Sequence, residues 1–261
     1  MADELTKWMQ CAEADLEGGV YSIPLEWGQK HPINREWQTL RLGPSEFSEH
    51  LESVCNRGRL LGIAPPEGAE GGWVICVDLD SVEALRLAKY FLPVTGEIAG
   101  RPSKRFAHYF FECESPPKTR RFRDTSNNTI LDLLSIGSQV VVEPSIHPSG
   151  EPYQWDALGK RGCVKALPIT FASSLLAVVC LFIVSSKTIE EFDVLCSQLD
   201  GQIEDLAHQR LLEAVSSLRL QGPRVLCSLV ESPKRDGSLL VDTHDEQSLN
   251  RIVHRAVGWL R

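Results

Sequence analysis

Residues Trp73 to Asp80 read Trp-Val-Ile-Cys-Val-Asp-Leu-Asp, an apolar run that ends in two carboxylates. Apolar and β-branched residues between a Gly-Gly pair and a serine predict a buried strand rather than a helix. Side chains alternate along a strand, so we expect Asp78 and Asp80 on one face, with their Cα atoms about 6.6 Å apart. A divalent cation such as Mg²⁺ or Mn²⁺ would offset the repulsion between the two charges. The alternative is that both aspartates are ordinary turn residues at the end of a strand.

The charge of the chain is unevenly distributed. The 261 residues are 43% hydrophobic and 24% charged, as in an ordinary soluble globular protein, and the formal net charge is −8. This total argues against a generally basic surface for nucleic acid. Between residues 99 and 123, however, seven basic residues stand against two glutamates: Arg101, Lys104, Arg105, Lys118, Arg120, Arg121 and Arg123. This local excess of positive charge is more informative about nucleic-acid binding than the net charge of the whole chain.

The cysteine pattern and the apolar segments bear on where the protein works. The eight cysteines form no Cys-x-x-Cys pair and no Cys/His cluster with zinc spacing, so we expect reduced thiols and a cytoplasmic protein. The N-terminal residues are polar and lack the apolar region of a signal peptide. The most apolar stretch, residues 169–184, is about 16 residues long and falls short of the ~20 that a membrane-spanning helix needs. It predicts a buried core helix, and no membrane partner is expected.

Helices and strands alternate along the first 160 residues, which predicts an α/β or α+β sheet domain. The patterns predict helices over residues 3–17, 45–55 and 81–91. They predict strands over residues 20–25, 60–64, 73–80, 107–111, 129–134, 139–142 and 153–155. Residues 56–58, 95–104 and 143–150 are predicted to be turns or loops, and residues 118–123 a loop or an exposed hairpin arm.

After Pro168 the spacing of the apolar residues becomes predominantly helical. Helical spacing predicts helices over residues 169–184 and 188–219 and a final amphipathic helix over residues 243–260, whereas residues 225–230 fit either a strand or a helix. We therefore expect a catalytic domain over residues 1–165 and a small, mainly helical accessory domain over residues 166–261.

Three further features have ordinary interpretations when taken singly. His108 lies in a short apolar strand and could be a satisfied core histidine. Asp132 lies in Thr-Ile-Leu-Asp-Leu-Leu and could be an aspartate at a strand edge. Residues 139–150 read Gln-Val-Val-Val-Glu-Pro-Ser-Ile-His-Pro-Ser-Gly and could be a strand followed by a turn.

Taken together, these features resemble the archaeo-eukaryotic primase superfamily, in its bifunctional DNA primase/polymerase branch. That family has an Asp-x-Asp at a strand end, a histidine on a later strand, a third carboxylate, and a Pro-Ser-x-His-Pro-x-Gly loop followed by Tyr-x-Trp. The matching residues here are Asp78-Leu79-Asp80, His108, Asp132, residues 144–150 and Tyr153-Gln154-Trp155. The resemblance covers about residues 8 to 165. It implies an α+β fold with an RRM-like mixed sheet and flanking helices.

The resemblance also implies roles for individual residues. Asp78, Asp80 and Asp132 would bind two Mg²⁺ or Mn²⁺ ions, and together with His108, which would contact the triphosphate, they form the expected catalytic set. The expected nucleotide-binding residues are His108, Arg101, Ser103, Lys104, Arg105, Ser145 and His147. Ser103 is included because the family often has a serine just before its histidine, where this chain has Phe106 and Ala107. Lys118, Arg120, Arg121 and Arg123 would bind the phosphates of a single-stranded DNA template.

The expected function is a metal-dependent DNA primase/polymerase that uses ribo- or deoxynucleoside triphosphates on single-stranded DNA in plasmid, phage or mobile-element replication. The sequence shows no helicase region, so we expect a stand-alone enzyme, a fragment, or a partner of a separate helicase. The first alternative is a catalytically inactive primase-fold protein that binds single-stranded nucleic acid in replication or defence. The second is a small-molecule nucleotidyltransferase, which would not need the basic residues 118–123.

Overall fold

The computed structural model describes residues 2–44, 46, 55–69, 71–123, 127–166, 169, 170, 172, 173, 176, 177, 180, 228–230 and 240–242. The chain divides into two compact units that alternate along the sequence. The first unit comprises Met1–Asp78, Val94–Thr119 and Leu133–Ala166, and the second comprises Leu79–Pro93, Arg120–Asp132 and Leu167–Arg261. The predicted boundary near residue 165 stays a prediction, because most residues beyond it lie outside the described part of the chain.

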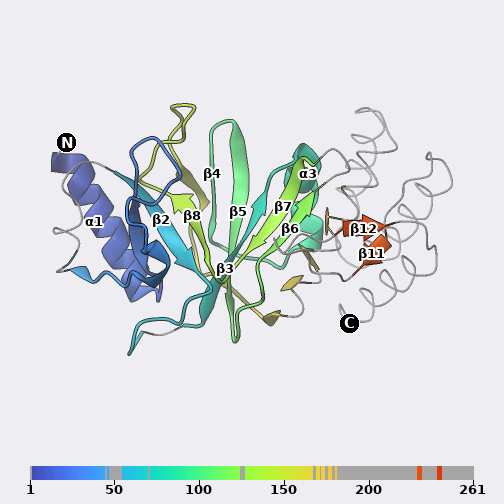
Figure 1. Ribbon diagram of the computed structural model, residues 1–261, viewed down its shortest axis with the longest axis horizontal. Helices are drawn as coiled ribbons and strands as arrows, with labels where there is room; N and C mark the ends of the chain where they lie inside the picture. Colours follow the sequence, from blue (N-terminus) through green and yellow to red (C-terminus); the bar gives the residue numbers. More distant parts are fainter. Residues whose placement is uncertain are drawn as a thin grey trace. The chain divides into compact units, whose positions relative to one another are not determined.

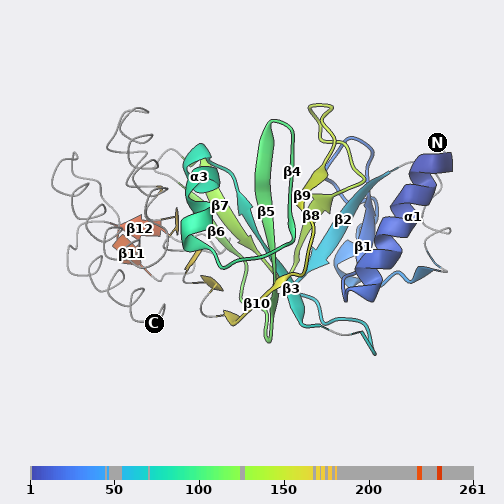
Figure 2. The same ribbon diagram turned by 180° about the vertical axis from the view of Figure 1, so that it is seen from behind.

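The first unit is an α+β structure with two sheets. Its elements are α1 (Ala2–Glu17), β1 (Ser22–Leu25), the 3₁₀ helix η1 (Trp37–Thr39), β2 (Asn56–Leu61), β3 (Trp73–Leu79), β4 (Ile98–Arg101), β5 (Lys104–Cys113), β8 (Ser138–Val142), β9 (Gln154–Ala157) and β10 (Gly162–Val164). One sheet is antiparallel, in the order β1-β2-β8. In the other sheet, β3, β5, β4 and β9 are successive antiparallel neighbours, and β10 pairs with β5 in parallel. Both ribbon views show α1 beside β1 and β2 (Figures 1 and 2).

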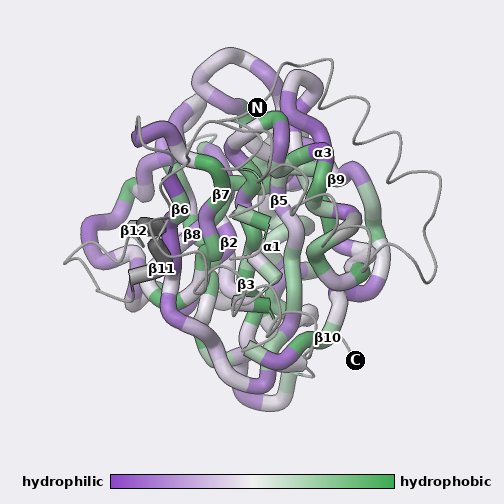
Figure 3. Tube along the Cα trace, turned by 90° about the vertical axis from the view of Figure 1, so that its right-hand side faces the viewer, coloured by the Kyte–Doolittle hydropathy of each residue, from purple (hydrophilic) through white to green (hydrophobic). Residues whose placement is uncertain are grey.

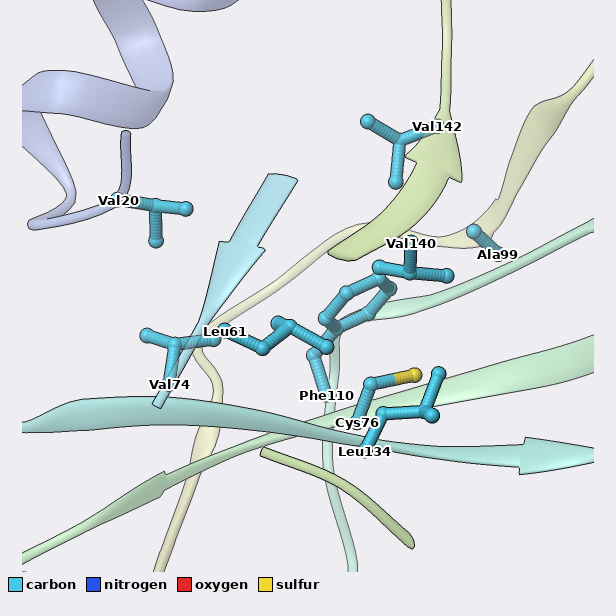
Figure 4. Packing of buried hydrophobic residues seen from close by; sticks show 9 residues of the cluster. All are labelled: Val20, Leu61, Val74, Cys76, Ala99, Phe110, Leu134, Val140 and Val142. Atoms are coloured by element: carbon cyan, nitrogen blue, oxygen red, sulfur yellow. The ribbon is translucent and has the colours of Figure 1, made fainter. Parts of the chain in front are cut away.

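The core of the first unit lies between these two sheets. Figure 4 shows side chains from both sheets in one cluster: Val20, Leu61, Val74, Cys76, Ala99, Phe110, Leu134, Val140 and Val142. Trp155 packs against this cluster, with its ring 5.5 Å from the ring of Phe110. The apolar run of β3 is green in Figure 3, which maps hydropathy along the chain. The apolar residues that follow Trp73 predict a buried strand, and in the structure this run is buried on both faces.

The second unit contains α3 (Val82–Phe91), β6 (Arg120–Arg123), most of β7 (Thr129–Leu134), β11 (Ser228–Val230) and β12 (Leu240–Asp242). Ser81 caps α3 by accepting a hydrogen bond from the backbone N–H of Ala84. Strand β6 neighbours β7, and β11 pairs with β12 in an antiparallel ladder. Residues 228–230 are thus a strand rather than a helix, and β12 was not predicted. Among the residues that the structure describes, no helix has both the length and the hydropathy of a membrane-spanning segment.

Most of the predicted elements of the first 160 residues are present. The helices over 3–17 and 81–91 are confirmed, as are the strands that correspond to β1, β3, β5, β7 and β8. The predicted helices over 45–55 and 188–219, and that over 243–260, lie outside the described residues, apart from residues 46 and 55. In the predicted 169–184 helix, the residues that are described are helical.

Other boundaries were predicted wrongly. Strand β2 begins at Asn56, where a helix-ending turn was expected, and β4 occupies residues 98–101 inside the predicted loop. Of the two alternatives for the basic segment, a loop or a hairpin arm, the structure has a strand at Arg120–Arg123, β6, which neighbours β7. Strand β10 was not predicted.

Long-range contacts explain why β4 and the first four residues of β2 were missed; the predicted strand over residues 60–64 overlaps only the end of β2. In β2 the guanidinium groups of Arg57 and Arg59 are buried against Asp15 of α1, so a polar sequence forms an interior strand. In β4 a Cβ atom at Gly100 would lie only 2.5 Å from the backbone oxygen of Lys104. Glycine is therefore required for the close approach of β4 and β5, although in the sequence it indicated a loop.

Candidate active site

The ladder between β3 and β5 places Asp78 directly opposite His108. The Oδ1 atom of Asp78 lies 3.5 Å from Nε2 of His108 and 3.9 Å from Nζ of Lys104. The side chain of Asp78 is 23% exposed, whereas that of His108 is 9% exposed. A carboxylate, an imidazole and an ammonium group therefore meet at one end of the β3–β5 ladder, where the Asp78 side chain is partly exposed to solvent. Three of the residues predicted from the sequence are thus brought together.

Aromatic rings connect His108 with the loop that follows β8. The ring of Tyr153 stacks on that of His108, with centroids 5.9 Å apart, and its edge contacts His147 at 6.0 Å. Burial, together with the positive charges of Arg101 and Lys30, lowers the pKa of His147. Its Nδ1 atom accepts a hydrogen bond from the backbone N–H of Ser149 at 3.1 Å. The imidazole of His147 is therefore held in place, and the ring of Tyr153 connects it with His108.

Ser145 lies inside the unit, only 4% exposed. Its hydroxyl accepts a hydrogen bond from the backbone N–H of Arg57 at 2.8 Å and lies 3.3 Å from the Arg57 carbonyl oxygen. The side chain of Asn56 forms two hydrogen bonds with the backbone of Ile146, the next residue of the loop. Its Oδ1 atom accepts one from the N–H at 2.9 Å, and its Nδ2 atom donates one to the carbonyl oxygen at 2.7 Å. In the structure Ser145 fixes the loop to β2. Asn56 was not singled out from the sequence as a loop anchor, because its partner is 90 residues away.

Glu151 fixes the β4–β5 turn to the same loop. Its carboxylate accepts hydrogen bonds from the backbone N–H and the hydroxyl of Ser103, both at 2.7 Å, and from the hydroxyl of Ser149 at 3.0 Å. It also forms an ion pair with Arg101. These hydrogen bonds, chiefly that from the Ser103 hydroxyl, lower the pKa of Glu151 to about 2. Arg101 and Ser103, two of the predicted nucleotide-binding residues, are therefore both bound to a carboxylate that the sequence did not point out.

Arg105 forms an ion pair with Asp156 of β9, at 2.6 Å from Nε to Oδ1. Its side chain is 60% exposed, so part of the guanidinium remains open to solvent. Lys118 is exposed in the segment before β6. Both residues are thus placed where a phosphate could reach them.

The remaining predicted residues belong to the second unit. Asp80 is exposed and directly follows β3, and its backbone N–H donates to the carbonyl of Ile130 at 2.8 Å. Asp132 of β7 is 17% exposed, with Oδ2 3.9 Å from Nε of Arg121. Arg120, Arg121 and Arg123 form β6 together with Phe122, whose side chain is buried. The second unit therefore carries two of the three predicted carboxylates and three basic residues.

A buried ion network supports the strand that anchors the loop. Asp15 of α1 binds both Arg57 and Arg59, and Arg59 also reaches Glu97 at 3.2 Å. Burial raises the pKa of Asp15, but the two guanidinium groups outweigh it and hold that pKa below its usual range. The guanidinium of Arg59 in turn lies over the rings of Phe110 and Trp155, at 5.0 and 4.5 Å. This network fixes α1 and β2 against the sheet that carries His108.

The carboxylates of Asp78, Asp80 and Asp132 are the candidate ligands for a metal ion. In the described part of the chain, the Oδ1 atom of Asp78 is buried and accepts no hydrogen bond, which leaves a hard oxygen donor available for a cation such as Mg²⁺ or Mn²⁺. Among those same residues, no group of three or more His, Cys, Asp and Glu side chains is placed to hold a metal ion. The first unit offers Asp78 as a ligand, and the second offers Asp80 and Asp132. The donor chemistry fits a divalent ion.

Comparison with known proteins adds an independent finding. A family model for the N-terminal domain of bifunctional DNA primase/polymerases matches residues 12–168, which is more than half of the chain. The matched region includes Asp78, His108, Asp132 and the loop anchored by Ser145. No curated protein sequence matches the chain. By the extent of this match, the chain belongs to the bifunctional DNA primase/polymerase family.

Proposed function

We propose that the protein is a metal-dependent DNA primase/polymerase that adds nucleotides on a single-stranded DNA template, as part of the replication of a plasmid, phage or other mobile element. The observation that carries the proposal is the juxtaposition of Asp78, His108 and Lys104 at the open end of the β3–β5 ladder. Membership in the primase/polymerase family supports nucleotidyl transfer as the reaction class.

Asp78, Asp80 and Asp132 would hold two Mg²⁺ or Mn²⁺ ions. When bound, such ions activate the attacking 3′-hydroxyl and stabilise the charge on the triphosphate. The remaining roles belong to side chains of the protein. His108 would donate a hydrogen bond to the triphosphate, and its Nε2 atom lies 3.5 Å from Oδ1 of Asp78, the proposed metal ligand. Lys104 would neutralise phosphate charge as it develops in the transition state.

The loop after β8 would support the sugar and phosphates of the nucleotide. Tyr153 contacts both His108 and His147, so a change in the loop would be transmitted to His108. Arg101 and Ser103 would contact phosphate from the β4–β5 turn, where Glu151 positions them. Lys118 and the three arginines of β6 would bind the template through its phosphates, which is independent of base sequence and sensitive to salt.

The test is a primer-synthesis assay. The protein is incubated with single-stranded DNA, labelled ribo- or deoxynucleoside triphosphates, and either Mg²⁺ or Mn²⁺, and the products are separated by size. The proposal predicts products of several nucleotides that are lost in Asp78→Asn. Binding of single-stranded DNA without any product, under all of these conditions, would instead support the inactive, strand-binding alternative.

A further inference from the structure

Phe106 is an exposed aromatic residue in a strained backbone conformation. It is 41% exposed, although phenylalanine is usually buried. Its φ angle is 55°, in the left-handed region that a bulky side chain rarely adopts. Within the described residues, Asn127 is the only other non-glycine residue with a positive φ, and asparagine tolerates this region far better. Strained residues persist where the surroundings fix them, and they concentrate at functional sites.

Asp156 of β9 fixes this conformation. Its Oδ2 atom accepts a hydrogen bond from the backbone N–H of Phe106 at 2.7 Å, and its Oδ1 atom accepts one from Nε of Arg105 at 2.6 Å. The Asp156 side chain is 7% exposed, whereas that of its partner Arg105 is 60% exposed. A Cβ atom at Gly100 would lie 2.9 Å from Oδ2, so the glycine provides the space that Asp156 occupies. Residues of β4, β5 and β9 together thus fix the backbone conformation in which Phe106 is exposed.

The chemistry beside Phe106 is that of a single-strand binding surface. The guanidinium carbon of Arg105 lies 4.9 Å from the centre of the Phe106 ring, and the Arg105 side chain is 60% exposed. Proteins bind single-stranded nucleic acids by combining an exposed aromatic ring, on which a base stacks, with a cation that binds the neighbouring phosphate. In β5, Phe106 also lies between Lys104 and His108, whose side-chain nitrogens are 3.9 and 3.5 Å from Oδ1 of Asp78.

We propose that Phe106 is a stacking platform for a nucleobase and that Arg105 binds the adjoining phosphate. This inference rests on the proposed function and assigns it a residue that the sequence did not point out. A residue needed only for packing would be buried, and a residue needed only to form the bend would be glycine. The base comes from the single-stranded template or from the incoming nucleotide, and the experiment separates these two sources.

The experiment compares Phe106→Leu, Phe106→Tyr and Phe106→Gly with the wild type and with Val94→Ala, a change at an apolar residue that is 94% exposed. Binding to a fluorescent oligothymidylate is measured by anisotropy and repeated with an abasic oligomer of the same length. Nucleotide binding is measured by calorimetry with a nucleoside triphosphate. Thermal unfolding of each variant is recorded in parallel.

Stacking on one aromatic side chain predicts that Phe106→Leu binds one of the two ligands about 5- to 100-fold more weakly. Phe106→Tyr and Val94→Ala should bind as the wild type does, and the abasic oligomer should not distinguish Phe106→Leu from the wild type. Phe106→Gly should bind as weakly as Phe106→Leu yet unfold at a higher temperature, because glycine relieves the left-handed strain. A loss confined to oligothymidylate identifies the template base, and a loss confined to the triphosphate identifies the incoming base.

Two results would overturn the inference while leaving the proposed function intact. One is wild-type binding of both ligands by Phe106→Leu, and the other is an equal loss on the normal and abasic oligomers. If the wild type itself binds neither ligand, the inference and the proposed function fail together.

Discussion

Asp78 and His108 are paired across β3 and β5, with Oδ1 of the aspartate 3.5 Å from Nε2 of the histidine. Two rigid strands therefore hold a candidate metal ligand and a candidate triphosphate ligand at a fixed separation. The His108 side chain is 9% exposed and that of Asp78 is 23% exposed. Substitution of each residue can therefore test its own role, binding of the triphosphate for His108 and binding of a metal ion for Asp78.

Changing His108 to Ala should raise the nucleotide KM by about 10- to 100-fold, because a hydrogen bond to a charged group contributes roughly 1.5–3 kcal/mol. Single-stranded DNA affinity should stay at the wild-type level. The measurement is a nucleotide titration of primer extension, with DNA binding determined separately. His108→Asn, which keeps a donor, should show a smaller rise. A larger effect on DNA affinity than on KM would remove His108 from the triphosphate.

Replacing Arg120, Arg121 and Arg123 of β6 by Gln should weaken single-stranded DNA binding and reduce its salt dependence. Each phosphate contact that is lost lowers the slope of log K against log salt by about 0.7 for a single strand. Affinity is measured by anisotropy between 50 and 300 mM salt, with Arg35→Gln in the exposed loop after β1 as the matched control. An unchanged slope in the triple variant would exclude β6 as the template-binding strand.

Asp15→Asn should destabilise the protein by about 3–5 kcal/mol, because it leaves two buried guanidinium groups without their shared carboxylate. The free energy of unfolding is measured by urea titration. Glu13→Gln, at an exposed position of the same helix, should change it by less than about 0.5 kcal/mol. Equal stability of Asp15→Asn and the wild type would show that the network does not hold α1 against β2.

We expect the contribution of Glu151 to the stability of the fold to depend on pH. Its pKa is lowered from 4.5 to about 2 in the folded protein, so its carboxylate stabilises the fold above pH 4.5, and this contribution is lost as the pH falls toward 2. The melting temperature of the wild type should therefore exceed that of Glu151→Gln near pH 6, and the difference should shrink between pH 4.5 and 2. Glu36→Gln is the control at an exposed position. A difference that stays constant over this range would show that the bonds to Ser103 and Arg101 do not depend on the charge.

The sequence predicted the elements whose pattern is local. The alternating and apolar runs around Asp78, His108 and Asp132 identified β3, β5 and β7, and Ser81 identified the start of α3. The order of these motifs was enough to indicate the family.

What the sequence could not predict depends on partners that are far away in the chain. Arg57 falls in a predicted turn, but in the structure both Arg57 and Arg59 are buried in β2 and bound to Asp15, more than 40 positions earlier. The same holds for Glu151 and Asp156, whose partners in the β4–β5 turn are about 50 residues away. Propensity and periodicity carry no information about such contacts, which arise only when the sheet has formed.

Binding of Mn²⁺, followed by the paramagnetic resonance signal of the free ion in the presence of a nucleoside triphosphate, tests whether Asp78 and Asp80 at the end of β3 act on the same ions as Asp132 of β7. We predict that Asp78→Asn, Asp80→Asn and Asp132→Asn each weaken Mn²⁺ binding by at least 10-fold, while Glu36→Gln binds as the wild type does. Wild-type Mn²⁺ affinity in Asp132→Asn, together with a loss in Asp78→Asn, would show that Asp132 does not belong to the metal site.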